Sequence, residues 1–375
     1  PRGKVGTGFT DAKRQELLGR LRKLEDGKAP FAFPEKQVTW IRPELVAEIE
    51  FAELTAEGSI RQGSFISLRE DKPAGDVHLD AIQKGTAEED DLKVMNTTIT
   101  HPERVVFPDD GITKLEVARF YERVGKLMLP YVRNRPLAIL RAPDGIGGQT
   151  FFQKSFKAHV PDHVHTKTLE DGTEIFFVKD VKGIVSLAQF GMVEIHPWGS
   201  GFPNPDKPDQ LIWDLDPDSA VPWKEILGAA FLLRDFLAER GLETIVKTSG
   251  GKGLHVILPL KRVHGWDVMK PFSKAVASAV AEFNPKRFIV TSSIRKRAGK
   301  IYIDWLRNGK GATCVVPWGL RARATAPVST PLDWDDLAEL AQTGFHINEP
   351  FSLPDDWKNI KPQSVTKKHL KEFGL

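Results

Sequence analysis

Hydrophobic residues recur along the chain with two different periods, and each period marks a different kind of element. Apolar residues at helical spacing predict helices over residues 12–24, 113–128, 223–239 and 266–283. Alternating or short continuous apolar runs predict strands over residues 44–54, 64–68, 211–216, 243–260 and 300–305, the fourth of which contains a glycine-rich turn. Strands and helices are interspersed without internal repeats. The pattern therefore predicts an α+β fold with mixed sheets and flanking helices.

A polar stretch separates two regions of the chain. Residues 80–91 show little apolar periodicity and end in four consecutive acidic residues, a composition that suits a linker better than a core element. We therefore expect a small domain over 1–76, a linker over 77–96 and a larger domain over 97–375. The alternating strands of the small domain favour an OB-like β-barrel.

Composition narrows the class of protein. The chain has 375 residues, of which 41% are hydrophobic and 27% charged, as is ordinary for a soluble protein of about two domains. No apolar run approaches the roughly 20 residues that cross a membrane, and the N-terminus lacks the apolar stretch of a signal peptide. The single cysteine, Cys314, favours a reducing compartment. We expect a cytoplasmic protein without a membrane partner, and the start at Pro1 suggests a fragment of a longer chain.

Two aspartates at the end of an apolar run are the first candidates for chemistry. In a strand, Asp214 and Asp216 point to the same face, roughly 6–7 Å apart, and Pro217 favours the end of the strand there. Two carboxylates this close repel each other unless a cation lies between them, and Mg²⁺ or Mn²⁺ prefers such oxygen ligands. The alternative is a solvated acidic turn.

Asp304 adds a third carboxylate, on a predicted strand with apolar neighbours. A carboxylate in such surroundings needs a partner, because burying it unpaired is costly. It could complete a three-carboxylate metal cage with Asp214 and Asp216, the arrangement that supports two-metal phosphoryl transfer. A structural salt bridge, for instance with Arg307, is the alternative.

The glycine-rich turn at residues 248–255 is a candidate phosphate site. Its three glycines let backbone N–H groups approach a phosphate, and Ser249, Lys252 and His255 add polar side chains. The GxxxxGK[ST] spacing of a Walker A motif is absent. A plain glycine-rich hairpin is the alternative.

Further candidates are single basic or aromatic side chains. Because the net charge is only +3, an anionic partner must be bound by local clusters of basic residues rather than by the charge of the whole chain. The candidates are His196, Arg321, Phe151, Phe152, Arg104 and Lys114. The phenylalanine pair offers faces on which bases of single-stranded nucleic acid stack. Each has a plainer alternative: a packed histidine beside proline and tryptophan, core phenylalanines, and solvated surface charges.

Taken in order, these segments resemble a known family, the polymerase domain of bacterial DNA ligase D, in the archaeo-eukaryotic primase superfamily. From about Thr98 to Leu340 they read ITHPERVVFP, RPLAILRAPDGI, FFQK, EIHPWG, DLDPD, TSGGKGLHV, DWLRN and GLRAR. The resemblance implies a primase-polymerase-type fold and template-directed addition of nucleotides to 3′ ends in non-homologous end joining.

The resemblance also implies roles for the candidate residues. Asp214, Asp216 and Asp304 match the family's catalytic, metal-binding carboxylates, which implies two Mn²⁺ or Mg²⁺ ions as cofactors. The nucleotide-binding positions are matched by His196, Ser249, Lys252, His255 and Arg321. The DNA-binding positions are matched by Phe151 and Phe152 for the template and by Arg104 and Lys114 for the 5′-phosphate of the downstream strand.

Substrates and partners are implied in the same way. They are NTPs in preference to dNTPs, DNA ends or gapped duplexes with a 5′-phosphate, and a Ku-type end-binding protein, in the bacterial cytoplasm near the nucleoid. Ser155 follows FFQK where many relatives have histidine, and Leu306-Arg307 stands where some relatives carry Ser-Gln. The first departure affects the role expected of the side chain at position 155. The second affects the nucleotide contacts expected near Leu306 and Arg307.

The first region resembles the C-terminal OB domain of ATP-dependent DNA ligases in three segments. They are KVGTGF from Lys4, WIRPELV from Trp40 and LREDK from Leu68. The KxDG lysine of the adenylation domain is absent from this chain, so we expect it to join a ligase module to a polymerase module without ligating by itself. Two other function classes stay open, a metal-dependent nuclease and a non-catalytic DNA-end-binding module.

Overall fold

The computed structural model describes residues 3–27, 38–50, 53–54, 60–68, 74, 92–156, 159–340 and 344–375. Contacts divide the chain into two units, Pro1–Ala87 and Glu88–Leu375. The predicted linker lies outside the described residues except for positions 92–96. There, β5 (Lys93–Val94) pairs with β6 (Thr97–Thr98), and Val94 is buried in the core of the larger unit. The larger unit therefore begins before residue 97.

In the described part of the first unit, one helix accompanies four strands. The strands are β1 (Gly3–Thr7), β2 (Ala47–Glu50), β3 (Glu53–Leu54) and β4 (Ile60–Leu68), and β4 pairs with the other three. α1 (Asp11–Arg22) begins after Thr10, whose side chain accepts a hydrogen bond from the Lys13 N–H. The predicted alternation is thus realised as strands, and closure into a barrel stays a prediction.

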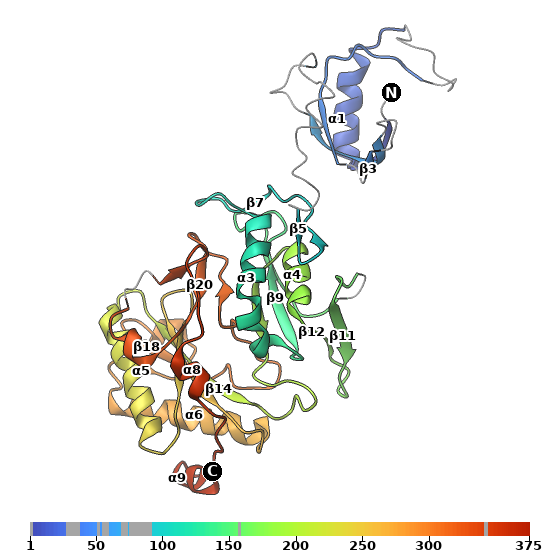
Figure 1. Cartoon of the computed structure of the whole chain (residues 1–375). Helices are drawn as coiled ribbons and strands as arrows, with labels where there is room; N and C mark the ends of the chain where they lie inside the picture. The colour runs from blue at the N-terminus through green and yellow to red at the C-terminus, as the bar shows by residue number, and fades with distance from the viewer. Residues whose placement is uncertain are drawn as a thin grey trace. The chain divides into compact units, whose positions relative to one another are not determined.

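The larger unit is organised around a six-stranded sheet (Figure 1). Its strands, in spatial order, are β17 (Phe288–Ile289), β18 (Ile301–Asp304), β14 (Gln210–Pro217), β16 (Leu254–Pro259), β15 (Ile245–Thr248) and β21 (Pro331–Leu332). α5 (Trp223–Ala238) and α6 (Trp266–Phe283) pack their apolar stripes on one face of this sheet and share its core. Both helices confirm the predicted ranges to within one residue.

A second layer combines α3 (Lys114–Val132) and α4 (Val181–Gln189) with a three-stranded sheet. That sheet has the order β10 (Phe151–Gln153), β9 (Leu137–Arg141) and β13 (Met192–Pro197). α3 begins with a capping box between Thr113 and Glu116. It continues past the predicted end at residue 128 because Met128 and Val132, one helical turn apart, are both buried in this core.

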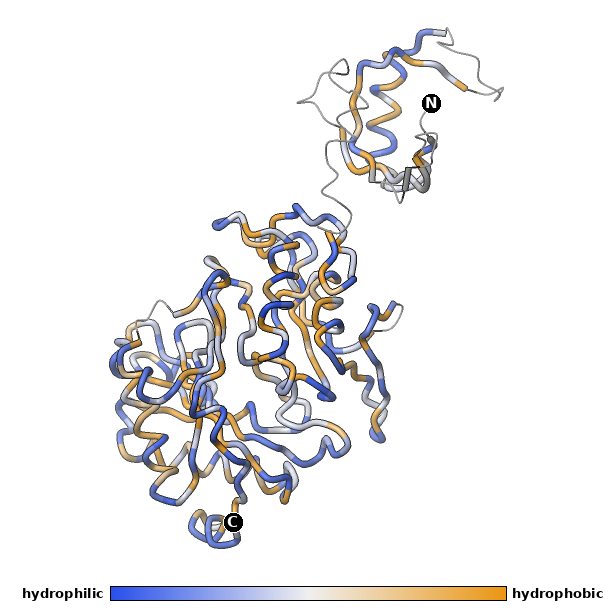
Figure 2. The backbone as a smooth tube through the Cα atoms, viewed as in Figure 1, coloured by the Kyte–Doolittle hydropathy of each residue, from blue (hydrophilic) through white to orange (hydrophobic). Residues whose placement is uncertain are grey.

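Shorter elements complete the larger unit. They are β7 (Val105–Phe107), β8 (Ile112–Thr113), β11 (Val164–Thr168), β12 (Glu174–Val178), η2 (Ile294–Lys296), β19 (Gly319–Leu320), β20 (Pro327–Ser329), α7 (Trp334–Leu337), β22 (Phe345–His346), α8 (Asp355–Asn359) and α9 (Lys367–Glu372). Hydrophobic and hydrophilic stretches alternate along the helices (Figure 2), as expected where one face packs on a sheet. Of the helices described, none is long and apolar enough to span a membrane. The predicted α+β class is confirmed.

Candidate active site

β14 places its aspartates on the face of the sheet opposite α5 and α6. Leu211, Trp213 and Leu215 are fully buried in the core that these helices share with the sheet. Because side chains alternate along a strand, Asp214 and Asp216 lie on the other face. The strand ends at Pro217, as the sequence predicts.

The register of the sheet aligns three more residues with Asp214. Asp214 lies opposite Asp304 of β18 on one side and opposite His255 of β16 on the other, and His255 lies opposite Lys247 of β15. Directly opposed residues share a face. Asp304, Asp214, His255 and Lys247 therefore form a line across the centre of the sheet, here called the cross-strand row.

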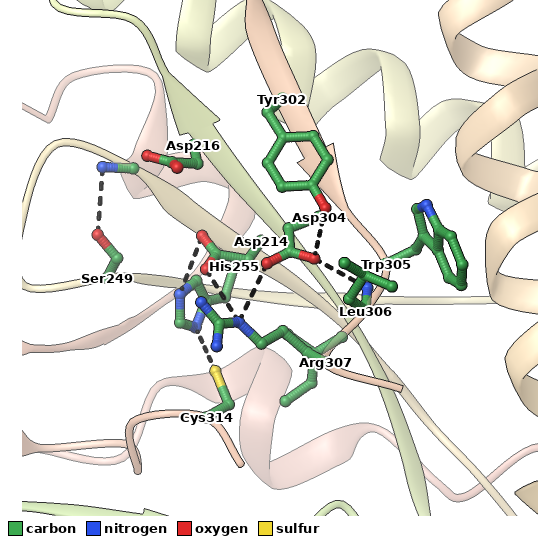
Figure 3. Close-up of polar contacts among 12 residues, drawn as sticks. Asp214, Asp216, Ser249, His255, Tyr302, Asp304, Trp305, Leu306, Arg307 and Cys314 are labelled. Carbon is green, nitrogen blue, oxygen red and sulfur yellow. Dashed lines mark hydrogen bonds and ion pairs between the residues drawn. The ribbon is translucent and has the colours of Figure 1, made fainter. Parts of the chain in front are cut away.

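Arginine side chains pair with all three predicted carboxylates. Nε of Arg307 lies 3.3 Å from Oδ2 of Asp304 and 3.6 Å from Oδ2 of Asp214 (Figure 3). Asp216 pairs with Arg297 instead, at 2.8 Å between Nη1 and Oδ2. The salt bridge between Asp304 and Arg307, which the sequence offers as an alternative to a metal site, is therefore present.

The donor atoms suit a hard divalent cation, although they are not assembled around one as they stand. Within the described ranges, no group of three or more His, Cys, Asp or Glu side chains is arranged to hold a metal ion. Asp214 and Asp304 nevertheless each direct Oδ2 at the same positive nitrogen, and two converging carboxylate oxygens are what Mg²⁺ or Mn²⁺ requires. The carboxylates fit a metal in donor type, and the three-carboxylate cage stays a prediction.

The neighbours of the cross-strand row set its charges. Burial would raise the pKa of Asp214, but His255, 3.3 Å away from Nε2 to Oδ1, and Arg307 outweigh burial and lower it. For Asp216, burial and the charge of Asp214 raise the pKa. Nδ1 of His255 lies 3.2 Å from Sγ of buried Cys314. Burial would lower the pKa of His255, but Cys314 and Asp214 raise it.

The turn between β15 and β16 lies against the end of β14. Ser249 closes the turn, because its Oγ accepts the Gly253 N–H at 3.1 Å and its own N–H donates to the Gly253 carbonyl at 3.0 Å. Gly250 has φ +65°, a left-handed conformation that favours glycine. A β-carbon at Gly253 would lie 2.3 Å from the carbonyl oxygen of Leu215. The absence of a side chain there lets the turn approach β14 between its two aspartates.

We expect Gly253→Ala to destabilise the protein by about 1–3 kcal/mol, the usual cost of overpacking. The added methyl group must displace either the β14 backbone at Leu215 or the turn itself. Urea denaturation followed by circular dichroism measures the change. Gly147→Ala is the matched control, because a β-carbon there meets Pro108 at an ordinary 3.6 Å. Equal stability of the two variants would contradict the packing argument.

A cavity of about 260 Å³ lies on this face of the sheet and unites most of the predicted residues. It is lined by His196, Asp214, Asp216, Pro217, Ser249, Lys252, Gly253, His255, Arg307, Thr313, Cys314, Val315, Arg321 and Arg323. Lysine and arginine contribute four of these side chains and aspartate two. Carboxylates with a surplus of positive charge are what a polyphosphate bound together with a divalent cation requires.

A buried glutamate that the sequence motifs do not single out connects two of the predicted residues. Oε2 of Glu194, which is 4% exposed, lies 2.7 Å from Nε2 of His196 and 3.1 Å from Nε of Arg321. Its Oε1 accepts the Ala322 N–H at 2.8 Å. Burial would raise the pKa of Glu194, but the hydrogen bond with His196 and the charge of Arg321 lower it to about 2. The signal for this contact is the Glu-x-His spacing, which puts both side chains on one face of a strand.

Lys247 is a second functional candidate that the sequence motifs leave out. It is fully buried, and its Nζ donates to Oγ of Ser329 at 2.6 Å. Burial lowers its pKa to about 8. Its place in the cross-strand row follows from the pairing of β15 with β16, which no local motif contains.

The two phenylalanines of β10 lie at the surface. Phe151 is 39% exposed and Phe152 57% exposed, so the alternative that they are core residues is excluded. Phe152 meets the ring of His196 edge to face at 5.3 Å, and the guanidinium of Arg141 lies 5.3 Å from the centre of the Phe151 ring. Aromatic surface is therefore available next to the cavity.

Arg104 and Lys114 form a separate basic pair at the start of α3. The Lys114 N–H donates to the Arg104 carbonyl at 2.8 Å, and Lys114 Nζ donates to the Thr100 carbonyl at 2.9 Å. Lys114 is only 8% exposed, and burial together with Arg104 lowers its pKa to about 8. A solvated surface charge, the alternative from the sequence, does not describe Lys114.

Two known families match the chain. Residues 113–358 match the family described as LigD, primase-polymerase domain. Residues 1–72 match the ATP dependent DNA ligase C terminal region. The predicted site residues from Lys114 to Arg321 lie within the first match, and Arg104 lies just before it.

Several relatives resemble the chain over most of its length. The multifunctional non-homologous end joining protein LigD of Pseudomonas aeruginosa is 39% identical over 355 residues, which are 90% of this chain and 42% of that protein. The bifunctional LigD of Bacillus subtilis is 24% identical over 306 residues, 79% of this chain and 48% of that protein. The chain thus spans less than half the length of either relative.

A solved structure has a fold similar to that of this chain. It is the polymerase domain from Mycobacterium tuberculosis ligase D in complex with DNA, which is 27% identical. The similarity has a TM-score of 0.60 and covers 74% of this chain and 94% of that one. With well over half of its residues in the first family match, the chain belongs to the LigD family and contains its primase-polymerase domain, preceded by a DNA ligase C-terminal region.

Proposed function

We propose that this chain is a DNA repair polymerase that adds nucleotides to primer 3′ ends in non-homologous end joining. The observation that carries the proposal is the cross-strand row, in which Asp214 and Asp304 meet beside a cavity lined by Ser249, Lys252 and Arg321. Nucleotidyl transfer requires carboxylates for metal ions within reach of cations that hold a triphosphate. The names of the relatives, which refer to end joining, support DNA ends as substrates.

The side chains around the cavity have different roles in the proposed reaction. Asp214, Asp216 and Asp304 would hold two Mn²⁺ or Mg²⁺ ions, which would lower the pKa of the primer 3′-hydroxyl and stabilise the leaving pyrophosphate. Lys252 neutralises phosphate charge as an exposed cation at the cavity wall. The Ser249 hydroxyl accepts from Gly253 and keeps its own proton for a phosphate oxygen.

Other residues bind the nucleic acid. The exposed rings of Phe151 and Phe152 are suited to stacking on template bases, and Arg104 with Lys114 would hold the 5′-phosphate of the downstream strand. As the family resemblance implies, we expect ribonucleotides in preference to deoxyribonucleotides and short gaps as substrates. The expected partners are a Ku-type end-binding protein and the ligase module of the same parent protein.

Extension of a labelled primer in a gapped duplex with a 5′-phosphate tests the proposed function. The assay compares NTP with dNTP and Mn²⁺ with Mg²⁺, and we expect templated extension that is greatest with NTP and Mn²⁺. Primer shortening would indicate a nuclease instead. Binding without incorporation under all four conditions would leave an end-binding module.

The lowered pKa of Lys114 predicts that recognition of the 5′-phosphate depends on pH. Lys114 loses its charge as the pH rises through about 8, whereas an ordinary lysine stays charged to about pH 10. We expect the preference for a 5′-phosphate over a 5′-hydroxyl to fall about tenfold between about pH 7 and pH 9, the contribution of one charged hydrogen bond. Fluorescence anisotropy with the two duplexes measures it.

Lys114→Arg is the control for this pH dependence, because arginine stays charged throughout the range. The variant should keep its preference for the 5′-phosphate at pH 9. A wild-type preference that does not change with pH would show that Lys114 does not contact the phosphate.

A further inference from the structure

We propose that Arg307 is a displaceable counter-cation, which occupies the position of a metal ion between Asp214 and Asp304 and so sets the affinity of the site for divalent cations. The inference rests on the proposed function, because it assumes that these two carboxylates bind metal. It deepens that function by assigning a role to a side chain that is not itself a proposed metal ligand.

In both Asp214 and Asp304, the Oδ1 atom has other partners than the Oδ2 atom, which faces Arg307 (Figure 3). Oδ1 of Asp304 accepts hydrogen bonds from the Tyr302 hydroxyl at 3.0 Å and the Leu306 N–H at 2.8 Å. Oδ1 of Asp214 lies 3.3 Å from Nε2 of His255. Oδ2 of each carboxylate faces Nε of Arg307, at 3.3 and 3.6 Å. A single guanidinium nitrogen thus faces both of the carboxylates that are proposed to hold metal.

The backbone on both sides of Arg307 is fixed by hydrogen bonds. On one side, the Leu306 N–H is held by Asp304. On the other, buried Asn308 accepts the Ile212 N–H and donates to the Ile212 carbonyl, each at 2.7 Å. The Arg307 side chain itself is 44% exposed and borders the cavity. Rotation of this side chain alone can therefore open the carboxylate pair without movement of the segment that carries it.

The carboxylates of Asp214 and Asp304 can pair with Arg307 or with a metal ion, but not with both at once. Two carboxylates at opposed strand positions repel each other, and Arg307 compensates for this repulsion when no metal is bound. A metal ion held by Asp214 and Asp304 would compete with Arg307 for the negative charge of these carboxylates, so the ion pairs with Arg307 would be lost when it binds. Loss of the two partly exposed ion pairs together corresponds to a factor of about five to ten in binding.

Titration with Mn²⁺, followed by electron paramagnetic resonance without DNA or nucleotide, tests the proposal. Arg307→Gln should bind Mn²⁺ about fivefold to tenfold more tightly than the wild type, whereas Arg307→Lys keeps a positive charge and should bind nearly as the wild type does. Lys310→Gln is the matched control, because Lys310 pairs with Asp171 at 2.8 Å and Asp206 at 2.9 Å instead.

Thermal melting gives a second measurement that does not depend on activity. Metal-free Arg307→Gln should melt below the metal-free wild type, because its carboxylates are uncompensated, and Mn²⁺ should raise its melting temperature by more than it raises that of the wild type.

The outcomes separate this inference from the proposed function. Equal or weaker Mn²⁺ binding by Arg307→Gln, where Asp304→Asn abolishes binding, would overturn the role of Arg307 and leave the polymerase intact. A wild type that neither binds Mn²⁺ nor extends a primer would contradict both.

Discussion

Asp214→Asn is expected to reduce primer extension by about three orders of magnitude or more, because a metal-binding carboxylate contributes several kcal/mol to the stability of the transition state. The substitution preserves the shape of the side chain and the pairing of β14 with its neighbours. It removes the charge that faces His255 and Arg307 at the centre of the cross-strand row. Asp304→Asn, opposite Asp214 in the ladder, should have a comparable effect.

Binding to DNA ends should survive Asp214→Asn, because Arg104 and Lys114 belong to a separate site. Anisotropy with the gapped duplex measures this binding next to the extension assay. Asp218→Asn is the matched control: Asp218 follows the end of β14, and its side chain accepts the Ala220 N–H at 3.1 Å. Full extension by Asp214→Asn would contradict a catalytic role for β14 and favour a non-catalytic end-binding module.

Glu194→Gln is expected to lower the free energy of unfolding by about 3 kcal/mol, as the loss of one partner from a buried ion pair does. The amide oxygen can still accept the Ala322 N–H. The amide nitrogen, however, is a donor directed at His196 and Arg321, so the guanidinium loses its negative partner. Because both residues line the cavity, nucleotide affinity should fall as well. Urea denaturation and a nucleotide titration measure the two effects.

The acid dependence of stability provides an independent signature of Glu194. Its pKa is about 2 in the folded protein against an ordinary 4.5. Ionised Glu194 therefore stabilises the folded state fully above about pH 4.5, and this contribution is lost as the pH falls toward 2. Glu194→Gln should lack this part of the acid dependence, whereas Glu174→Gln, at an exposed position of β12, should retain it. If Glu194→Gln were as stable as the wild type both above pH 4.5 and near pH 2, the buried hydrogen-bond and ion-pair network of Glu194 would contribute little to stability.

Local patterns predict those parts of the site that lie within one element. The alternation around Asp214 predicts its face of β14, apolar spacing predicts α5 and α6, and three glycines predict the turn from Ser249 to His255. These features depend on the period of side chains along a strand or helix and on the conformational freedom of glycine, which the sequence displays directly.

Contacts between distant segments are harder to predict from the sequence. The family resemblance suggests that Asp304 joins Asp214, but the pairing of Glu194 with Arg321 and of Arg297 with Asp216, and the place of Lys247 beside His255, depend on strand order and register. A charged residue in a local pattern looks the same whether its partner is water, an arginine or a metal. The boundary before residue 97 is also missed, because β5 is short and follows an acidic stretch.

The pairing of Asp214 with Asp304 also constrains how the sheet can assemble. If β18 slipped by one residue against β14, Ile303 would lie opposite Asp214, and the side chain of Asp304 would turn toward the apolar core beneath α5 and α6. Burying an unpaired carboxylate there is costly, and exposing Ile301 and Ile303 on the other face forfeits their burial. The residues proposed for chemistry thus disfavour the neighbouring misfolded registers, so that selection for a working site is at the same time selection for accurate strand pairing.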